Sequence, residues 1–244
     1  MTLLDARAPQ GSNEVGEDTW ELFEAIEQSF GVNLGDYLDL AGISVLELSQ
    51  RIDQAASYPT ESSCLSSVAF YRLRRAFQTV AKTPRSMLRP GARIEELLPT
   101  RNRHLQWESL QSELGLELPK LHLPGWLLLL SIVLPVFLLT SIRLFSGIRI
   151  SGAMIAIGSF VLIFFALRAA MLYPVREVPR SCETLGDLAQ AMLAKNYKYF
   201  ADNYGSSPER GIYPALRILI AMQTGINIDE VLPETRIPSD LDIY

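Results

Sequence analysis

Residues 123–142 read LPGWLLLLSIVLPVFLLTSI, and residues 150–167 read ISGAMIAIGSFVLIFFAL. Neither run contains a charged residue, and only seven residues separate them. A helix rises about 1.5 Å per residue, so about 20 apolar residues are needed to cross the hydrocarbon core of a bilayer. With the second run extended to Tyr173, the pattern predicts a transmembrane hairpin over residues 123–174, with helices over about 123–142 and 150–173.

The residues beside these runs fit a membrane hairpin. Trp126 and Tyr173 stand where one membrane interface is expected, and Arg143 and Arg149 bracket the turn on the opposite side. Lysine and arginine are more frequent beside the outer ends of the hairpin than in its turn, which predicts an integral protein of the bacterial cytoplasmic membrane with both termini cytoplasmic. A buried helical hairpin inside a soluble domain is the alternative, because short apolar runs also form core helices.

Charge is distributed unevenly along a chain whose net charge is −5. Residues 1–56 hold 11 acids and 2 bases, whereas residues 70–105 hold 9 bases and 2 acids. The basic segment could attract the acidic one or lie on anionic lipid headgroups. The lipid bilayer is therefore one expected partner, and no nucleic-acid partner is expected. The expected membrane-surface bases are Arg72, Arg74, Arg75, Arg101 and Arg103.

The rest of the chain shows helical periodicity between short polar breaks. A first helix is expected from Asp18 or Thr19, either of which can cap it, to Gly31, and a second begins after a cap at Ser44. The last helix is expected to open at Pro214. Three segments are expected to lack regular helix: a flexible tail over residues 1–15, a linker over 55–67, and a polar stretch over 198–211.

Three pairs of segments resemble each other within the chain. The apolar pattern of residues 44–52 recurs in 184–192, that of 26–34 recurs in 110–118, and that of 87–97 recurs in 231–241. The last pair follows two predicted helices that both contain a Leu-Arg step. The chain is therefore expected to hold two copies of one helical unit, one interrupted by the hairpin and the other divided between the chain's two ends.

These segments resemble acyl carrier proteins. The C-terminal sequence ALRILIAMQTGINIDEVLPETRIPSDLDIY looks like the first helix and long loop of a carrier, and GEDTWELFEAIEQSFGVNLGDYLDLAGISVLELSQRI looks like the remainder. The resemblance implies an all-α fold in which residues 213–244 and 16–54 form one carrier-like bundle in permuted order. Residues 68–119 with 183–196 would form a second, membrane-proximal bundle. The divided unit can close within one chain or, by self-association, between two chains.

A carrier works through a serine that bears phosphopantetheine. In the alignment that places the recognition helix at Thr19 onward, that position is Gly16, which has no hydroxyl group. A competing register over residues 37–45 makes Ser44 the attachment point and phosphopantetheine the cofactor. Otherwise no cofactor, no metal and no catalysis are expected, since the two histidines and two cysteines form no metal-binding or nucleophilic motif.

The resemblance also implies a surface for protein partners, since carriers dock through an acidic helix face on basic partner surfaces. The matching acids are Glu17, Asp18, Glu21 and Glu24. The sequence thus predicts a membrane-anchored, non-catalytic carrier-like protein that acts as a docking or scaffold module. Two alternatives stay open at this point: a membrane-tethered carrier modified at Ser44, and an accessory structural subunit of a larger membrane complex.

Overall fold

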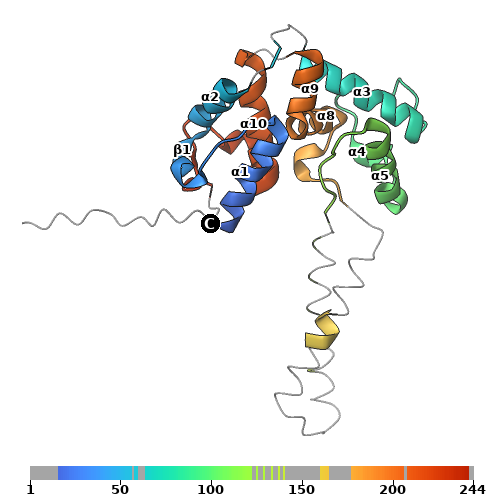
Figure 1. Cartoon of the computed structure of the whole chain (residues 1–244). Helices are drawn as coiled ribbons and strands as arrows, with labels where there is room; N and C mark the ends of the chain where they lie inside the picture. The colour runs from blue at the N-terminus through green and yellow to red at the C-terminus, as the bar shows by residue number, and fades with distance from the viewer. Residues whose placement is uncertain are drawn as a thin grey trace, which may run out of the picture. The chain divides into compact units, whose positions relative to one another are not determined.

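The computed structural model describes residues 16–56, 58–59, 64–122, 160–164, 177–205 and 208–241, and the single positions 125, 129, 133, 137 and 140. The chain divides into two compact units, which are residues 1–70 with 189–244 (unit 1) and residues 71–188 (unit 2). The described parts of both units are mostly helical (Figure 1).

The expected transmembrane hairpin requires a correction. In the described ranges, no helix is both long enough and apolar enough to cross a membrane. The longest, α10, has 17 residues and a polar side, whereas a span needs about 20 mostly apolar residues. The predictions of a transmembrane hairpin and of an integral membrane protein are corrected on this finding. Most of the two apolar runs lies outside the described residues; their described positions are helical, and several of their side chains are exposed.

Unit 1 is assembled from the first and the last parts of the chain. Its first part contributes helix α1 (Glu17–Phe30), the 3₁₀ helix η1 (Tyr37–Leu40), strand β1 (Ile43–Ser44) and helix α2 (Val45–Ala55). Its last part contributes α9 (Tyr197–Tyr204), α10 (Pro208–Thr224), the 3₁₀ helix η4 (Ile228–Glu230) and strand β2 (Arg236–Ile237).

The core of unit 1 forms where α10 packs against both α1 and α2 (Figure 1). Each of these helices is amphipathic and turns one apolar stripe inward. The fully buried side chains include Phe23, Ile26 and Phe30 of α1, Leu48 and Ile52 of α2, and Leu216 and Ile220 of α10. Burial of each such side chain stabilises the fold by about 1.5–3 kcal/mol, so this contact joins the two ends of the chain firmly.

A short antiparallel ladder also joins the two ends of the chain. Ile43 pairs with Ile237, and Ser44 pairs with Arg236. Beside the ladder, the Val45 amide donates to the Thr235 carbonyl at 2.9 Å. Residues 16–54 and 213–241 therefore lie in one unit.

Unit 2 contains the part of α3 (Leu65–Val80) that begins at residue 71, followed by α4 (Ile94–Leu97) and α5 (Arg103–Leu114). Helix α8 (Leu185–Lys195) begins in this unit. An isolated bridge pairs Arg93 with Thr184 and so attaches the start of α8 to the loop before α4. The 3₁₀ helices are η2 (Thr100–Asn102) and η3 (Arg180–Cys182).

The two units repeat the same local geometry. Ser44 caps α2 in a capping box with Glu47, and Thr184 forms the equivalent hydrogen bonds with Asp187 at the start of α8. Helices α1 and α5 both end at a left-handed glycine, with φ of 63° at Gly31 and 62° at Gly115.

The loops that meet these caps also correspond. In unit 1, the amides of Val45 and Leu46 donate to the carbonyls of Thr235 and Pro233. In unit 2, the amides of Leu185 and Gly186 donate to the carbonyls of Ala92 and Pro90, with the same spacing of donors and acceptors. The echo between residues 44–52 and 184–192 thus coincides with equivalent backbone contacts. The two loops correspond with Pro90 at Pro233 and Ala92 at Thr235, which is one residue out of the register expected from 87–97 and 231–241.

Candidate docking surface

One side of α1 is covered with acids and exposes an indole. Glu17, Trp20, Glu21 and Glu24 recur at the spacing that places side chains on one helix face, and all four are exposed. Trp20 leaves 52% of its surface in contact with solvent, which is high for a tryptophan in a folded unit. Asp18, the fourth predicted acid, is exposed in the first turn. These five residues are called the α1 face below.

The indole of Trp20 is held in place by a tyrosine beneath it. The rings of Trp20 and Tyr37 meet edge to face with centroids 4.5 Å apart, and Phe23 packs on the same tyrosine at 5.3 Å. The Tyr37 hydroxyl donates to Glu27 Oε2 at 2.7 Å. Burial, and then the nearby Glu27 carboxylate, raises the pKa of Tyr37 to about 12, so the phenol stays neutral. A neutral, hydrogen-bonded Tyr37 is a rigid support for the exposed Trp20.

The segment after Tyr37 adds further apolar and acidic groups. Leu38 is 57% exposed, and Asp39 is exposed beside it. The Asp36 carboxylate accepts a hydrogen bond from the Leu38 amide at 3.0 Å and so caps η1. The exposed Trp20 of α1 and the exposed Leu38 of η1 thus belong to two elements that contact each other through Tyr37, and both elements carry exposed acids.

Only some of these acids have a role in the helix itself. Glu17 and Asp18 lie in the first turn of α1, where a negative charge interacts favourably with the helix dipole. Glu21 and Glu24 lie beyond that turn, so the helix dipole does not account for them. The expected cap at Asp18 or Thr19 is wrong, because α1 begins at Glu17 with Gly16 as its N-cap, so that both residues lie within the helix. Glu21 and Glu24 are therefore the two acids of the α1 face that the helix dipole does not explain.

Ser44 lies at the first turn of α2 with its hydroxyl engaged in the cap. Its Oγ donates to Glu47 Oε2 at 2.9 Å and accepts from the Glu47 amide at 3.2 Å. The hydrogen bonds from the Ser44 amide and hydroxyl lower the pKa of the Glu47 carboxyl. The expected cap at Ser44 is confirmed, and the residue as a whole is half-buried.

The five expected membrane-surface arginines do not form one surface. Arg103 is only 2% exposed, and its Nε donates to the Leu98 carbonyl. Arg72 donates to the Leu114 carbonyl and Arg74 to the Arg85 carbonyl, so both guanidinium groups tie the backbone of unit 2 together. Arg75 is exposed. Arg101 lies in η2, and its side chain is outside the described set.

The four residues expected at membrane interfaces, Trp126, Tyr173, Arg143 and Arg149, lie outside the described residues.

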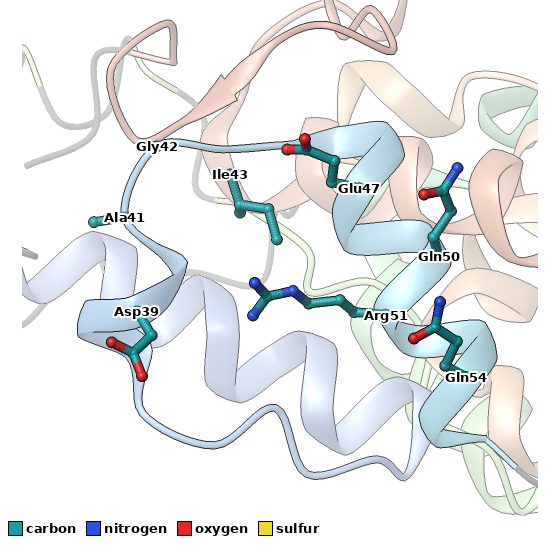
Figure 2. Close-up of a pocket in the computed structure, with 8 residues that line it drawn as sticks. All are labelled: Asp39, Ala41, Gly42, Ile43, Glu47, Gln50, Arg51 and Gln54. Carbon is teal, nitrogen blue, oxygen red and sulfur yellow. The ribbon is translucent and has the colours of Figure 1, made fainter.

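A shallow polar depression of about 450 Å³ lies beside α2 in unit 1 (Figure 2). Residues at helical spacing along α2 form one wall, and the Arg51 side chain extends from α2 toward Asp39 (Figure 2). The loop before β1 forms the other wall. The lining residues are Asp39, Ala41, Gly42, Ile43, Glu47, Gln50, Arg51 and Gln54. The periodicity of Glu47, Gln50, Arg51 and Gln54 was visible in the sequence, but only the fold brings Asp39 opposite to them.

The described residues hold an exposed thiol of lowered pKa and no group of metal ligands. Within the described ranges, no three or more His, Cys, Asp or Glu side chains are grouped as metal ligands. Cys64 is an exposed free thiol, and hydrogen bonds from Ser66 and Ser67 lower its pKa to about 7. Cys182 is buried, and burial raises its pKa to about 11.

Comparisons with known proteins add no relative. No family model matches the chain, and neither the curated proteins nor the solved structures contain a match to it. The resemblance to acyl carrier proteins therefore rests on the quoted residues alone.

Proposed function

We propose that this chain is a non-catalytic docking module built from carrier-like helical units, and that the α1 face receives the partner. The observation that supports this proposal best is the exposed Trp20 on its Tyr37 support, with Glu21 and Glu24 alongside. Exposed tryptophans held rigidly are typical anchors of protein interfaces, because they bury a large area at little entropic cost.

The chemistry of the partner follows from the surface. Exposed carboxylates on the same helix face as an exposed tryptophan favour a partner that presents arginine or lysine beside an apolar side chain. Arginine also stacks on an indole face, which adds a cation–π term to the charge pairing. Such charges mainly accelerate and orient the encounter, whereas Trp20 and Leu38 supply the buried area.

A photo-crosslinking experiment tests the proposal. The full chain is produced in its own cells with a photoreactive benzoylphenylalanine at Glu21, or at the exposed control position Gln223 in α10. We expect protein adducts from position 21 and none from position 223. Equal adduct patterns at both positions, or adducts at neither, would remove the α1 face as a docking surface.

The carrier alternative is tested separately, by the intact mass of the chain after coexpression with a phosphopantetheinyl transferase. The Ser44 hydroxyl both donates and accepts within its capping box, so we expect an unmodified mass. A phosphopantetheine adduct that disappears in Ser44→Ala would instead establish an active carrier.

A further inference from the structure

The same turn occurs in both units, where it carries exposed acids in unit 1 and exposed bases in unit 2. Arg217 Nη2 donates to the Ile228 carbonyl at 2.7 Å, and Arg74 Nη2 donates to the Arg85 carbonyl at 2.8 Å, with the same separation along the chain. This match aligns residues 228–232 of unit 1 with residues 85–89 of unit 2. Their central anchors, Val231 and Leu88, are both completely buried.

The solvent-facing residues of these turns differ in sign. The unit 1 turn exposes Asp229 and Glu230, whereas the unit 2 turn exposes Arg85 and Arg89. Aligning the helices at Gly31 and Gly115 places Glu21 of α1 on Leu105 of α5 and Glu24 on Glu108. The helix is thus retained without an acid at the position of Glu21, whereas the acid at the position of Glu24 is present in both units.

The unit 2 turn presents an apolar side chain between cations. Met87 is 51% exposed, and the exposed Arg85 and Arg89 flank it in the sequence. Hydrogen bonds from the Met87 amide to the Pro84 carbonyl and from the Leu88 amide to the Arg85 carbonyl fix the turn. Lys82 is exposed just before it. Lys82, Arg85, Met87 and Arg89 are called the basic turn below.

We infer that the basic turn of one molecule docks on the α1 face of a second copy of this chain. This inference rests on the proposed function and names its partner. The charge complementarity is direct, since Glu21 and Glu24 would face Arg85 and Lys82. The apolar groups match as well, because a methionine thioether contacts an aromatic ring favourably and Met87 would meet Trp20.

The contact joins two different surfaces, so it is heterologous. Each molecule then carries one acidic and one basic surface, and association continues until a ring closes or a longer assembly forms. The expected signature is a mass that rises with protein concentration and falls with salt, because screening weakens exposed charge pairs.

Charge reversal provides a mixing test in the full chain. One variant, Glu21→Lys with Glu24→Lys, makes the α1 face basic. The other, Lys82→Glu with Arg85→Glu, makes the turn acidic and leaves Arg89, whose Nε donates to the Ser86 carbonyl, in place. Each variant alone opposes like charges, whereas a mixture of the two again offers complementary pairs. A matched control, Glu108→Lys with Glu113→Lys on the exposed side of α5, changes the net charge by as much as the first variant.

Sedimentation velocity over a wide concentration range supplies the readout. We expect the wild type and the control to associate, each variant alone to associate about tenfold or more weakly, and the equimolar mixture to recover association. Thermal unfolding checks that all variants remain folded. A wild type that keeps the mass of one chain at every concentration, or a mixture no better than its components, overturns the inference. The adducts at position 21 then decide independently whether the α1 face still docks another protein.

Discussion

Arg217 of α10 and Arg74 of α3 hold equivalent positions in the two units, and each binds a carbonyl eleven residues further along the chain. Arg217 makes a second bond, from Nε to the Val231 carbonyl at 2.7 Å. In unit 2 the corresponding Nε of Arg74 is buried without a hydrogen-bond partner. The arginine therefore bonds through both Nε and Nη2 in unit 1, whereas the Nε bond is missing in unit 2.

This difference predicts unequal costs for the same substitution. Arg217→Met removes the arginine donor to the Val231 carbonyl and leaves the Ile228 carbonyl with the Val231 amide as a donor, and it is expected to lower the free energy of unfolding of unit 1 by about 1–3 kcal/mol. Arg74→Met removes one bond and also an unsatisfied buried donor, so its cost to unit 2 is expected to be smaller. Amide hydrogen exchange measured separately for each unit compares them, and an equal or larger loss in Arg74→Met would contradict the assignment.

The side-chain caps of α2 and α8 should contribute similar amounts to the free energy of unfolding. Ser44→Ala and Thr184→Ala each remove the side-chain oxygen that accepts from the third amide of a helix, so each is expected to cost about 1 kcal/mol. Ser109→Ala is a suitable control, because that hydroxyl bonds the Leu105 carbonyl inside α5, where alanine is the better helix former. Thermal unfolding should show two destabilised variants and an unchanged or slightly more stable control. A destabilisation in the control as large as in the cap variants would contradict this explanation.

The exposed thiol of Cys64 should react at neutral pH. Its pKa is lowered from 9.0 to about 7, so the thiolate fraction, and with it the rate of alkylation by iodoacetamide, should rise through pH 7 and level off above it. Ser66→Ala removes the largest cause and should move the midpoint to higher pH. Cys182, buried and with a pKa near 11, should stay unmodified in the folded chain. A wild-type midpoint near pH 9 would show that the serines do not stabilise the thiolate.

The phenol of Tyr37 should lose its proton only at high pH. Its pKa is raised to about 12 in the folded chain, against 10.0 for an unperturbed phenol. The neutral form is therefore favoured by folding, and the associated stability is complete below pH 10 and is lost as the pH rises toward 12. Tyr37→Phe keeps the ring under Trp20 but removes this dependence along with the bond to Glu27. Unfolding by urea at a series of alkaline pH values should show a shallower loss of stability in the variant than in the wild type.

The features that local chemistry fixes could be predicted from the sequence. The end of α1 at Gly31 and the cap at Ser44 are confirmed, because left-handed glycines and capping serines act within a few residues. Helix α9 was missed, although Tyr197, Phe200, Ala201 and Tyr204 have helical spacing, because the polar residues between them suggested a loop. Helix α10 begins at Pro208 rather than at Pro214, which the helix accommodates in its interior.

The surfaces were harder to predict than the helices. The acids of the α1 face could be identified from their spacing, but the support of Trp20 by Tyr37 depends on a loop folding back on the helix. Arg103 looked like a surface base and is instead buried, with its Nε bonded to the Leu98 carbonyl, which no local pattern reveals. The transmembrane prediction relied on the length and apolarity of two runs, and no helix in the described ranges meets both conditions.

A disulfide between the two ends of the chain tests most directly whether unit 1 closes as described. Ile43→Cys and Ile237→Cys, introduced together in a Cys64→Ser background, replace residues that are paired across the antiparallel ladder. After mild oxidation, mass spectrometry and non-reducing electrophoresis should show one disulfide within a single chain, which is absent from either single-cysteine variant. Thiols that stay reduced, or disulfides found only between two chains, would contradict a unit 1 built from both ends of one molecule.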